Sequence, residues 1–84
     1  MNKIEQSLIQ ATVLQVLSNV LQKPLNQLAE DTNAKNTPNW DSLKHIEVMF
    51  AIEEEFSIQF SEAELSELNS VVKIVEAIKT HYAA

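Results

Sequence analysis

The sequence contains no glycine, and this absence limits what the chain can fold into more than any other feature. Tight β-hairpins depend on glycine because their turns need positive φ angles. The lack of glycine also excludes glycine-rich phosphate loops, dinucleotide fingerprints and the nucleophile elbow Gly-x-Ser-x-Gly, because each of these motifs contains glycine. An all-α fold is therefore expected, and the enzyme classes that use those loops are set aside.

The length of 84 residues, of which 45% are apolar, predicts a single domain over residues 1–84 with one core. Without cysteine the chain forms no disulfide and no cysteine-based zinc site, and two histidines far apart in the sequence predict no other metal site. No apolar run is long enough to cross a bilayer, and the first residues lack the layout of a signal peptide. A cytoplasmic location is expected.

The charge of the chain is strongly acidic, with a formal net charge of −6. Nucleic acids and anionic membrane surfaces require the opposite sign, so neither is an expected partner. Proteins with basic patches are the natural partners of such a surface. Size and charge together favour a monomer.

Helical periodicity dominates the first part of the chain and predicts a helix from about residue 2 to residue 21. Apolar residues recur at steps of three and four, and a second set widens the apolar face. The first set is Ile4, Leu8, Ala11, Leu14, Leu17 and Leu21, and the second is Ile9, Val13, Val16 and Val20.

Residues 24–40 are predicted to form a long connection, because Pro and Asn recur throughout this segment. Leu25, Leu28 and Trp40 are its expected attachments to the core. The indole N–H of a buried Trp40 is expected to bond a polar group.

Three further helices are predicted after this connection. The second helix runs from Asp41, a good N-cap residue, to about Phe56. Ser61 and Glu64 match a capping box, which predicts a short third helix from residue 62 to about 68. A last helix from residue 71 to about 81 completes a four-helix bundle with a long first loop and a short third helix.

Ser42 is the candidate functional residue, because it lies at the start of the second helix directly after Asp41. The first N–H groups of a helix have no partner within the helix, and the helix dipole is positive there. A phosphate esterified to Ser42 is favoured by both effects. No residue is assigned a catalytic role.

The Asp-Ser-Leu sequence at 41–43, followed by the acidic and apolar helix at 46–56, resembles the acyl carrier protein family. The resemblance extends from the first helix to Ile78. It implies that a phosphopantetheinyl transferase attaches 4′-phosphopantetheine from coenzyme A to Ser42. The arm would carry an acyl or aminoacyl group as a thioester and present it to acyl-loading and acyl-transfer enzymes, while the chain itself would catalyse nothing.

The resemblance also implies a partner-binding surface on the second helix. Residues 41–67 contain eight acidic residues and one lysine, which agrees with docking to basic patches. The positions that match the family's partner contacts are Asp41, Leu43, Ile46, Glu47, Phe50, Glu53 and Glu54. Packing of Phe50 in the core is a nearly equal alternative. Positions that match core or acyl-pocket residues are Val48, Met49, Ile52, Phe56, Leu65, Leu68, Val71 and Ile74.

The residues around the motif differ from the common fatty-acid pattern, with Thr37–Trp40 before the Asp and Lys44-His45 after the Leu. This favours a discrete carrier of a specialised fatty-acid, polyketide or related pathway.

Two other functions remain open from the sequence alone. An acidic helical interaction module without a prosthetic group would share most of these features. A small hydrolase would use Ser42 and His45, which are three residues apart on one helical face. No third group is expected to orient His45, which is predicted to be a surface residue.

Overall fold

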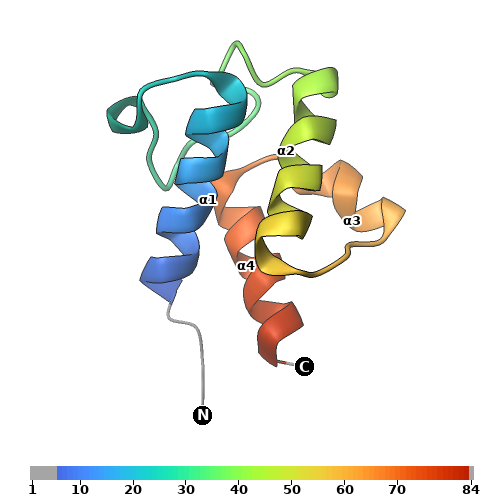
Figure 1. Cartoon of the computed structure of the whole chain (residues 1–84). Coiled ribbons are helices and arrows are strands. Elements are labelled where there is room, and N and C mark those ends of the chain that lie inside the picture. Colours follow the sequence, from blue (N-terminus) through green and yellow to red (C-terminus); the bar gives the residue numbers. More distant parts are fainter. Residues whose placement is uncertain (1–5, 84) are drawn as a thin grey trace.

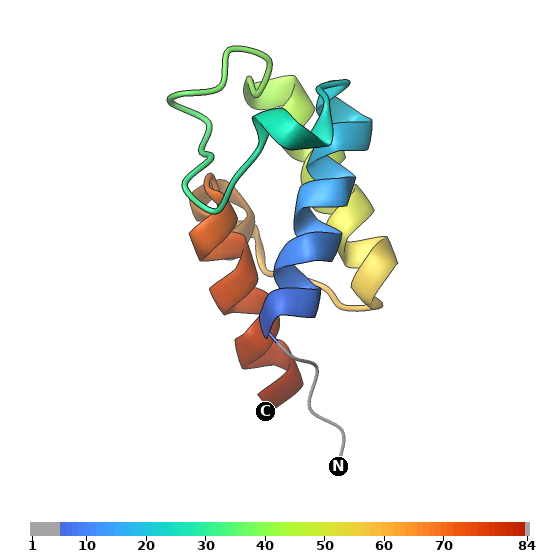
Figure 2. The ribbon, with the colours of Figure 1, turned by 90° about the vertical axis from the view of Figure 1, so that its left-hand side faces the viewer.

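The computed structural model describes residues 6–83 and confirms the predicted all-α fold. Its elements are α1 (Gln6–Leu21), the short 3₁₀ turn η1 (Leu25–Gln27), α2 (Ser42–Phe56), α3 (Glu62–Glu67) and α4 (Val71–Ala83). Helix α1 packs against both α2 and α4, while the short α3 lies to one side of them (Figures 1 and 2). Among the described residues, no helix is long and apolar enough to cross a membrane.

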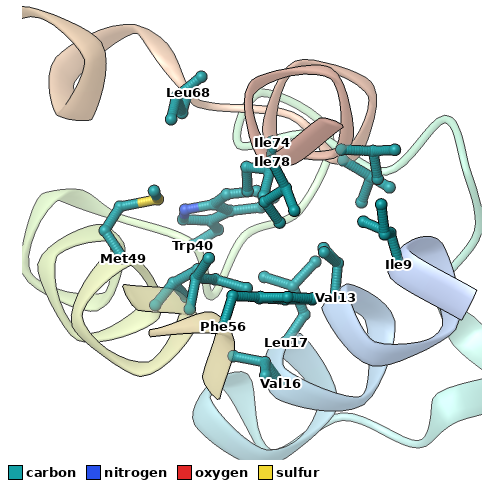
Figure 3. Packing of buried hydrophobic residues seen from close by; sticks show 14 of the residues in the cluster. Ile9, Val13, Val16, Leu17, Trp40, Met49, Phe56, Leu68, Ile74 and Ile78 are labelled. Carbon is teal, nitrogen blue, oxygen red and sulfur yellow. The ribbon is translucent and has the colours of Figure 1, made fainter. Parts of the chain in front are cut away.

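One cluster of apolar side chains joins the three long helices, and Figure 3 shows part of it. Helix α1 contributes Ile9, Val13, Val16, Leu17 and Leu21, α2 contributes Val48, Met49, Ile52 and Phe56, and α4 contributes Val71, Ile74, Val75 and Ile78. The connecting segments add Leu28, Trp40, Phe60 and Leu68. Burial of these side chains is the main stabilising contribution to the bundle.

The buried face of α1 differs from the predicted one. Leu8 and Ala11 were expected to face the core, but both are exposed, and Leu8 is 60% exposed. The core face of α1 combines Ile9, Val13 and Val16, which were expected only to widen the apolar face, with Leu17 and Leu21 of the first set, which are buried as predicted. The sequence places apolar residues on two adjacent stripes of this helix, and the packing of α2 and α4 determines which of these residues are buried. Ile4 lies outside the described residues.

The long connection is attached to the core at two of its three predicted points. Trp40 and Leu28 are buried, as predicted. The prediction for Leu25 is wrong, because this side chain is 47% exposed. Leu25 begins the 3₁₀ turn that starts the connection, and the chain turns inward only at its C-cap, Leu28.

Backbone hydrogen bonds fix the middle of the connection to the start of α4. The Ala34 N–H donates to the Asn69 carbonyl at 2.9 Å, and the Val71 N–H donates to the Thr32 carbonyl at 3.0 Å. These bonds surround an isolated antiparallel bridge between Asn33 and Ser70. A segment of irregular sequence is thereby held against the bundle, next to the start of α2.

Because the chain has no glycine, other residues adopt positive φ angles directly after α1 and α2. Gln22 and Ser57 follow these helices with φ angles of 56° and 55°, in the left-handed region that glycine usually occupies. A residue with a Cβ atom is destabilised there by roughly 1 kcal/mol.

Replacement of Ser57 by Gly is therefore expected to stabilise the chain by about 0.5–1 kcal/mol. Urea denaturation followed by far-UV circular dichroism measures the change. Ser66→Gly is the matched control, because this serine lies within α3, where glycine lowers helix stability by about 0.5 kcal/mol. Equal destabilisation by both substitutions would contradict the assignment of strain to Ser57.

Candidate functional site

The start of α2 is set by Asp41. Its backbone is extended, with φ −98° and ψ −173°, and its carboxylate Oδ1 accepts the Lys44 N–H at 2.9 Å. Its carbonyl accepts the His45 N–H at 2.8 Å and so closes the first turn. The predicted N-cap is confirmed, and it makes Ser42 the first residue of the helix.

Ser42 is exposed at the positive end of a fifteen-residue helix. The capping bonds of Asp41 go to the third and fourth N–H groups, those of Lys44 and His45, so they leave the N–H groups of Ser42 and Leu43 on the open side of the helix end. A phosphate ester on the Ser42 hydroxyl would lie next to these donors.

A groove of about 920 Å³ opens beside Ser42, between α2 and α3. Its apolar wall is formed by Ala34, Trp40, Ile46, Met49, Phe50 and Leu65. Its polar lining is formed by Asp41, Ser42, His45, Glu62, Ser66 and Asn69. A chain attached to Ser42 therefore has an apolar surface within reach.

The apolar residues predicted to contact partners are exposed along α2. Leu43, Ile46 and Phe50 are 67%, 51% and 62% exposed. For Phe50 this excludes the alternative of simple core packing. Exposed apolar side chains at neighbouring turns of one helix are typical of an interaction surface.

The predicted acidic contacts differ in their surroundings. Glu47 forms an exposed ion pair with Lys44 at 3.4 Å. The Glu53 carboxylate is partly buried and accepts the Phe60 N–H at 2.9 Å, so it fixes the segment between α2 and α3. Glu54 is exposed beside Val20 of α1. The partner role of these residues stays a prediction.

His45 is not the surface residue that the sequence predicted. Its side chain is partly buried, and both ring nitrogens are engaged. The Trp40 indole N–H donates to Nδ1 at 3.0 Å, and Nε2 lies 2.6 Å from the Leu65 carbonyl oxygen in α3. The prediction that the indole would find a polar partner is thus confirmed, and that partner is His45.

These two bonds also bear on the hydrolase alternative. A general base for Ser42 needs a ring nitrogen within hydrogen-bonding reach of the hydroxyl. Both nitrogens of His45 are instead directed at Trp40 and Leu65. The geometry therefore does not support a nucleophile and base on this helix.

The positions matched to core or acyl-pocket residues fall into two groups. Seven are buried, namely Val48, Met49, Ile52, Phe56, Leu68, Val71 and Ile74. Leu65 is half-buried, and it lines the groove together with Met49. The sequence did not indicate where the groove opens, because its far wall depends on where α3 lies.

The fold and this end of α2 define a class of protein: a small acidic helical bundle that presents a serine at a helix start beside an apolar groove. Residues 11–78 match the family model described as a phosphopantetheine attachment site. An acyl carrier protein of Buchnera aphidicola subsp. Baizongia pistaciae (strain Bp) is 37% identical over 83 residues, covering 96% of this chain and 97% of the relative. An acyl carrier protein of Rickettsia bellii (strain RML369-C) is 27% identical over 81 residues, covering 96% and 92%. The chain belongs to the acyl carrier protein family.

The cofactor of this family is covalently attached 4′-phosphopantetheine, and the residues at the start of α2 fit it. An exposed hydroxyl, the positive end of a helix and an adjacent apolar groove are together what a phosphate-linked arm with an acyl cargo requires. Proteins of this kind are carriers that interact with biosynthetic enzymes.

Proposed function

We propose that Ser42 is the residue to which phosphopantetheine is attached. The observation that carries the proposal is the exposed hydroxyl of Ser42 at the first position of α2, which Asp41 caps. The arm supplies the thiol on which an acyl or aminoacyl group is carried as a thioester. The residues around Ser42 stabilise the phosphate and give the cargo an apolar surface.

A phosphopantetheinyl transferase is the first partner that this proposal requires, followed by acyl-loading and acyl-transfer enzymes. A specialised fatty-acid, polyketide or related pathway is proposed from Trp40 and from Lys44-His45, which differ from the common fatty-acid pattern. A single domain over residues 1–84, a monomeric state and a cytoplasmic location stay predictions.

The direct test is incubation of the purified chain with coenzyme A and a broad-specificity phosphopantetheinyl transferase, followed by intact-mass measurement. A mass gain of one phosphopantetheinyl group is expected, and fragmentation of the modified chain should locate it at Ser42. A folded chain that gains no mass would favour the unmodified interaction module.

Helix α2 is proposed as the docking surface for these enzymes. Its exposed apolar residues Leu43, Ile46 and Phe50 supply contact area, and Asp41, Glu47, Glu53 and Glu54 supply negative charge. Glu53 is the least available of these, because one of its oxygens is bonded to the Phe60 N–H.

Reversal of one charge on this surface should slow docking. Glu47→Lys is expected to lower the rate of loading by the transferase roughly fivefold at low salt, the effect of one exposed ion pair of about 1 kcal/mol. The difference should shrink at high salt because surface charges are then screened.

Glu76→Lys is the matched control, because it makes the same charge change on an exposed residue of α4. Equal slowing by both substitutions would attribute the effect to net charge rather than to docking on α2.

A further inference from the structure

The two hydrogen bonds of His45 fix its protonation state. An indole N–H only donates, so Nδ1 must be without a proton to accept from Trp40. A carbonyl oxygen only accepts, so Nε2 must carry the proton that bonds Leu65. The geometry therefore requires neutral imidazole with its proton on Nε2.

The carbonyl that His45 bonds is one that α3 cannot satisfy by itself. The last carbonyls of a helix have no partner within it. In α3, the Glu64 carbonyl accepts the Leu68 N–H and the Glu67 carbonyl accepts the Asn69 N–H. The Leu65 carbonyl is instead bonded by His45, across the groove from α2.

Helix α3 has few other attachments to the bundle: Leu65 is partly buried against the core cluster, and Glu64 lies 3.9 Å from His81 of α4. It is six residues long, well below the length at which an isolated helix is stable. Its capping box with Ser61 stabilises its first turn, and Leu68, which follows it, is buried. The bond from His45 is a polar link between its last turn and α2, and it lies at the groove beside Ser42.

We propose that neutral His45 is a positioning residue that holds α3 at its place across the groove, and that protonation of Nδ1 releases this arrangement. A proton on Nδ1 would face the indole N–H of Trp40. Because both groups would then be hydrogen-bond donors, the ring must leave its present position. Because the ring also bonds Leu65, its movement shifts the end of α3 and changes the width of the groove.

Few other charged side chains lie near His45. Those that line the groove among the described residues are Asp41, before α2, and Glu62, at the start of α3, and both are acidic. Lys44, the neighbouring cation on α2, is directed at Glu47.

The inference deepens the proposed function, since a groove beside Ser42 matters to a cargo that Ser42 bears. It is nevertheless tested on the unmodified chain, so its failure is distinct from a failure of phosphopantetheine attachment. The chain suits such a test because it contains one tryptophan and two histidines.

The experiment follows the unmodified chain by ¹H–¹⁵N NMR from about pH 8 to about pH 5, across which imidazole side chains change charge. The ring nitrogens of His45 should report the Nε2–H tautomer at the upper end. The Trp40 indole N–H and the α3 amides should then shift together with the His45 ring as it gains its proton. The Nδ1–H tautomer, or an α3 that does not follow the ring, would overturn the proposal.

Two variants separate positioning from general stability. His45→Gln presents an amide oxygen to the indole and an amide N–H to Leu65, and does not titrate, so it should keep α3 in place and abolish its pH response. His81→Gln removes the other histidine, which lies 3.9 Å from Glu64 of α3, and should leave the response unchanged. A pH response of α3 that persists in His45→Gln and disappears in His81→Gln would assign it to His81 instead.

Discussion

Ser42→Ala is expected to abolish the attachment of phosphopantetheine entirely. The attached group needs a hydroxyl, and the transferase must find it at the start of α2, where Asp41 caps the helix and the dipole favours the phosphate. Intact mass after incubation with coenzyme A and the transferase measures the loss. The wild-type chain should gain one group, and the variant none.

The fold of this variant should be unchanged. The Ser42 side chain is exposed, and the cap bonds at this end come from Asp41. The free energy of unfolding should therefore change by less than about 0.5 kcal/mol. A larger loss in thermal denaturation would give Ser42 a structural role.

Ser66→Ala is the matched control for attachment. Ser66 is also an exposed serine that lines the groove, but it lies on α3. It should be loaded like the wild type. A normal mass gain in Ser42→Ala together with a loss in Ser66→Ala would transfer the proposed site to α3.

The features of the chain that were predictable from sequence are those that local chemistry decides. Asp41 caps α2 and Ser61 caps α3 because short polar side chains bond the N–H groups two or three residues ahead in almost any surroundings. The exposure of Ser42 followed from its place directly after such a cap.

The features that were missed depend on contacts between distant segments. On α1, the packing of α2 and α4 determines that Ile9 is buried and Leu8 is exposed, and the helical period of the sequence does not contain this information. His45 was placed on the surface because its partners, Trp40 and Leu65, come from the long connection and from α3. The location of the groove was missed for the same reason, since one of its walls is α3.

One signal in the sequence could have found the role of His45. A buried indole needs an acceptor, and His45 lies five residues after Trp40, at the first turn of the helix that Trp40 precedes. Trp40 and His45, two of the residues that set this chain apart from the common fatty-acid pattern, therefore bond each other beside Ser42.

Trp40→Ala is expected to produce the largest loss of stability. The side chain is 3% exposed within the core cluster, and Figure 3 shows its indole nitrogen on the side of Met49. Removal of a buried aromatic side chain costs about 3–5 kcal/mol, whereas small domains are stable by about 5–15 kcal/mol. The variant should therefore lose a large share of its stability and unfold at a much lower urea concentration than the wild type.

Urea denaturation followed by far-UV circular dichroism measures this loss, since the variant lacks the only tryptophan of the chain. Leu43→Ala is the control, because Leu43 is an apolar residue of α2 that is 67% exposed. This substitution should lower the free energy of unfolding by less than about 0.5 kcal/mol. Equal costs for the two substitutions would mean that Trp40 does not fix the connection to the core.

Trp40→Phe divides the effect into packing and hydrogen bonding. It keeps an aromatic ring but leaves the Nδ1 of His45 without its donor, so it should cost about 1–3 kcal/mol, between the other two variants. If the bond from Trp40 holds His45 in place, the α3 amides of this variant should no longer shift together with pH. A cost equal to that of Trp40→Ala would place the whole contribution of Trp40 in the hydrogen bond to His45, and a negligible cost would place it in packing alone.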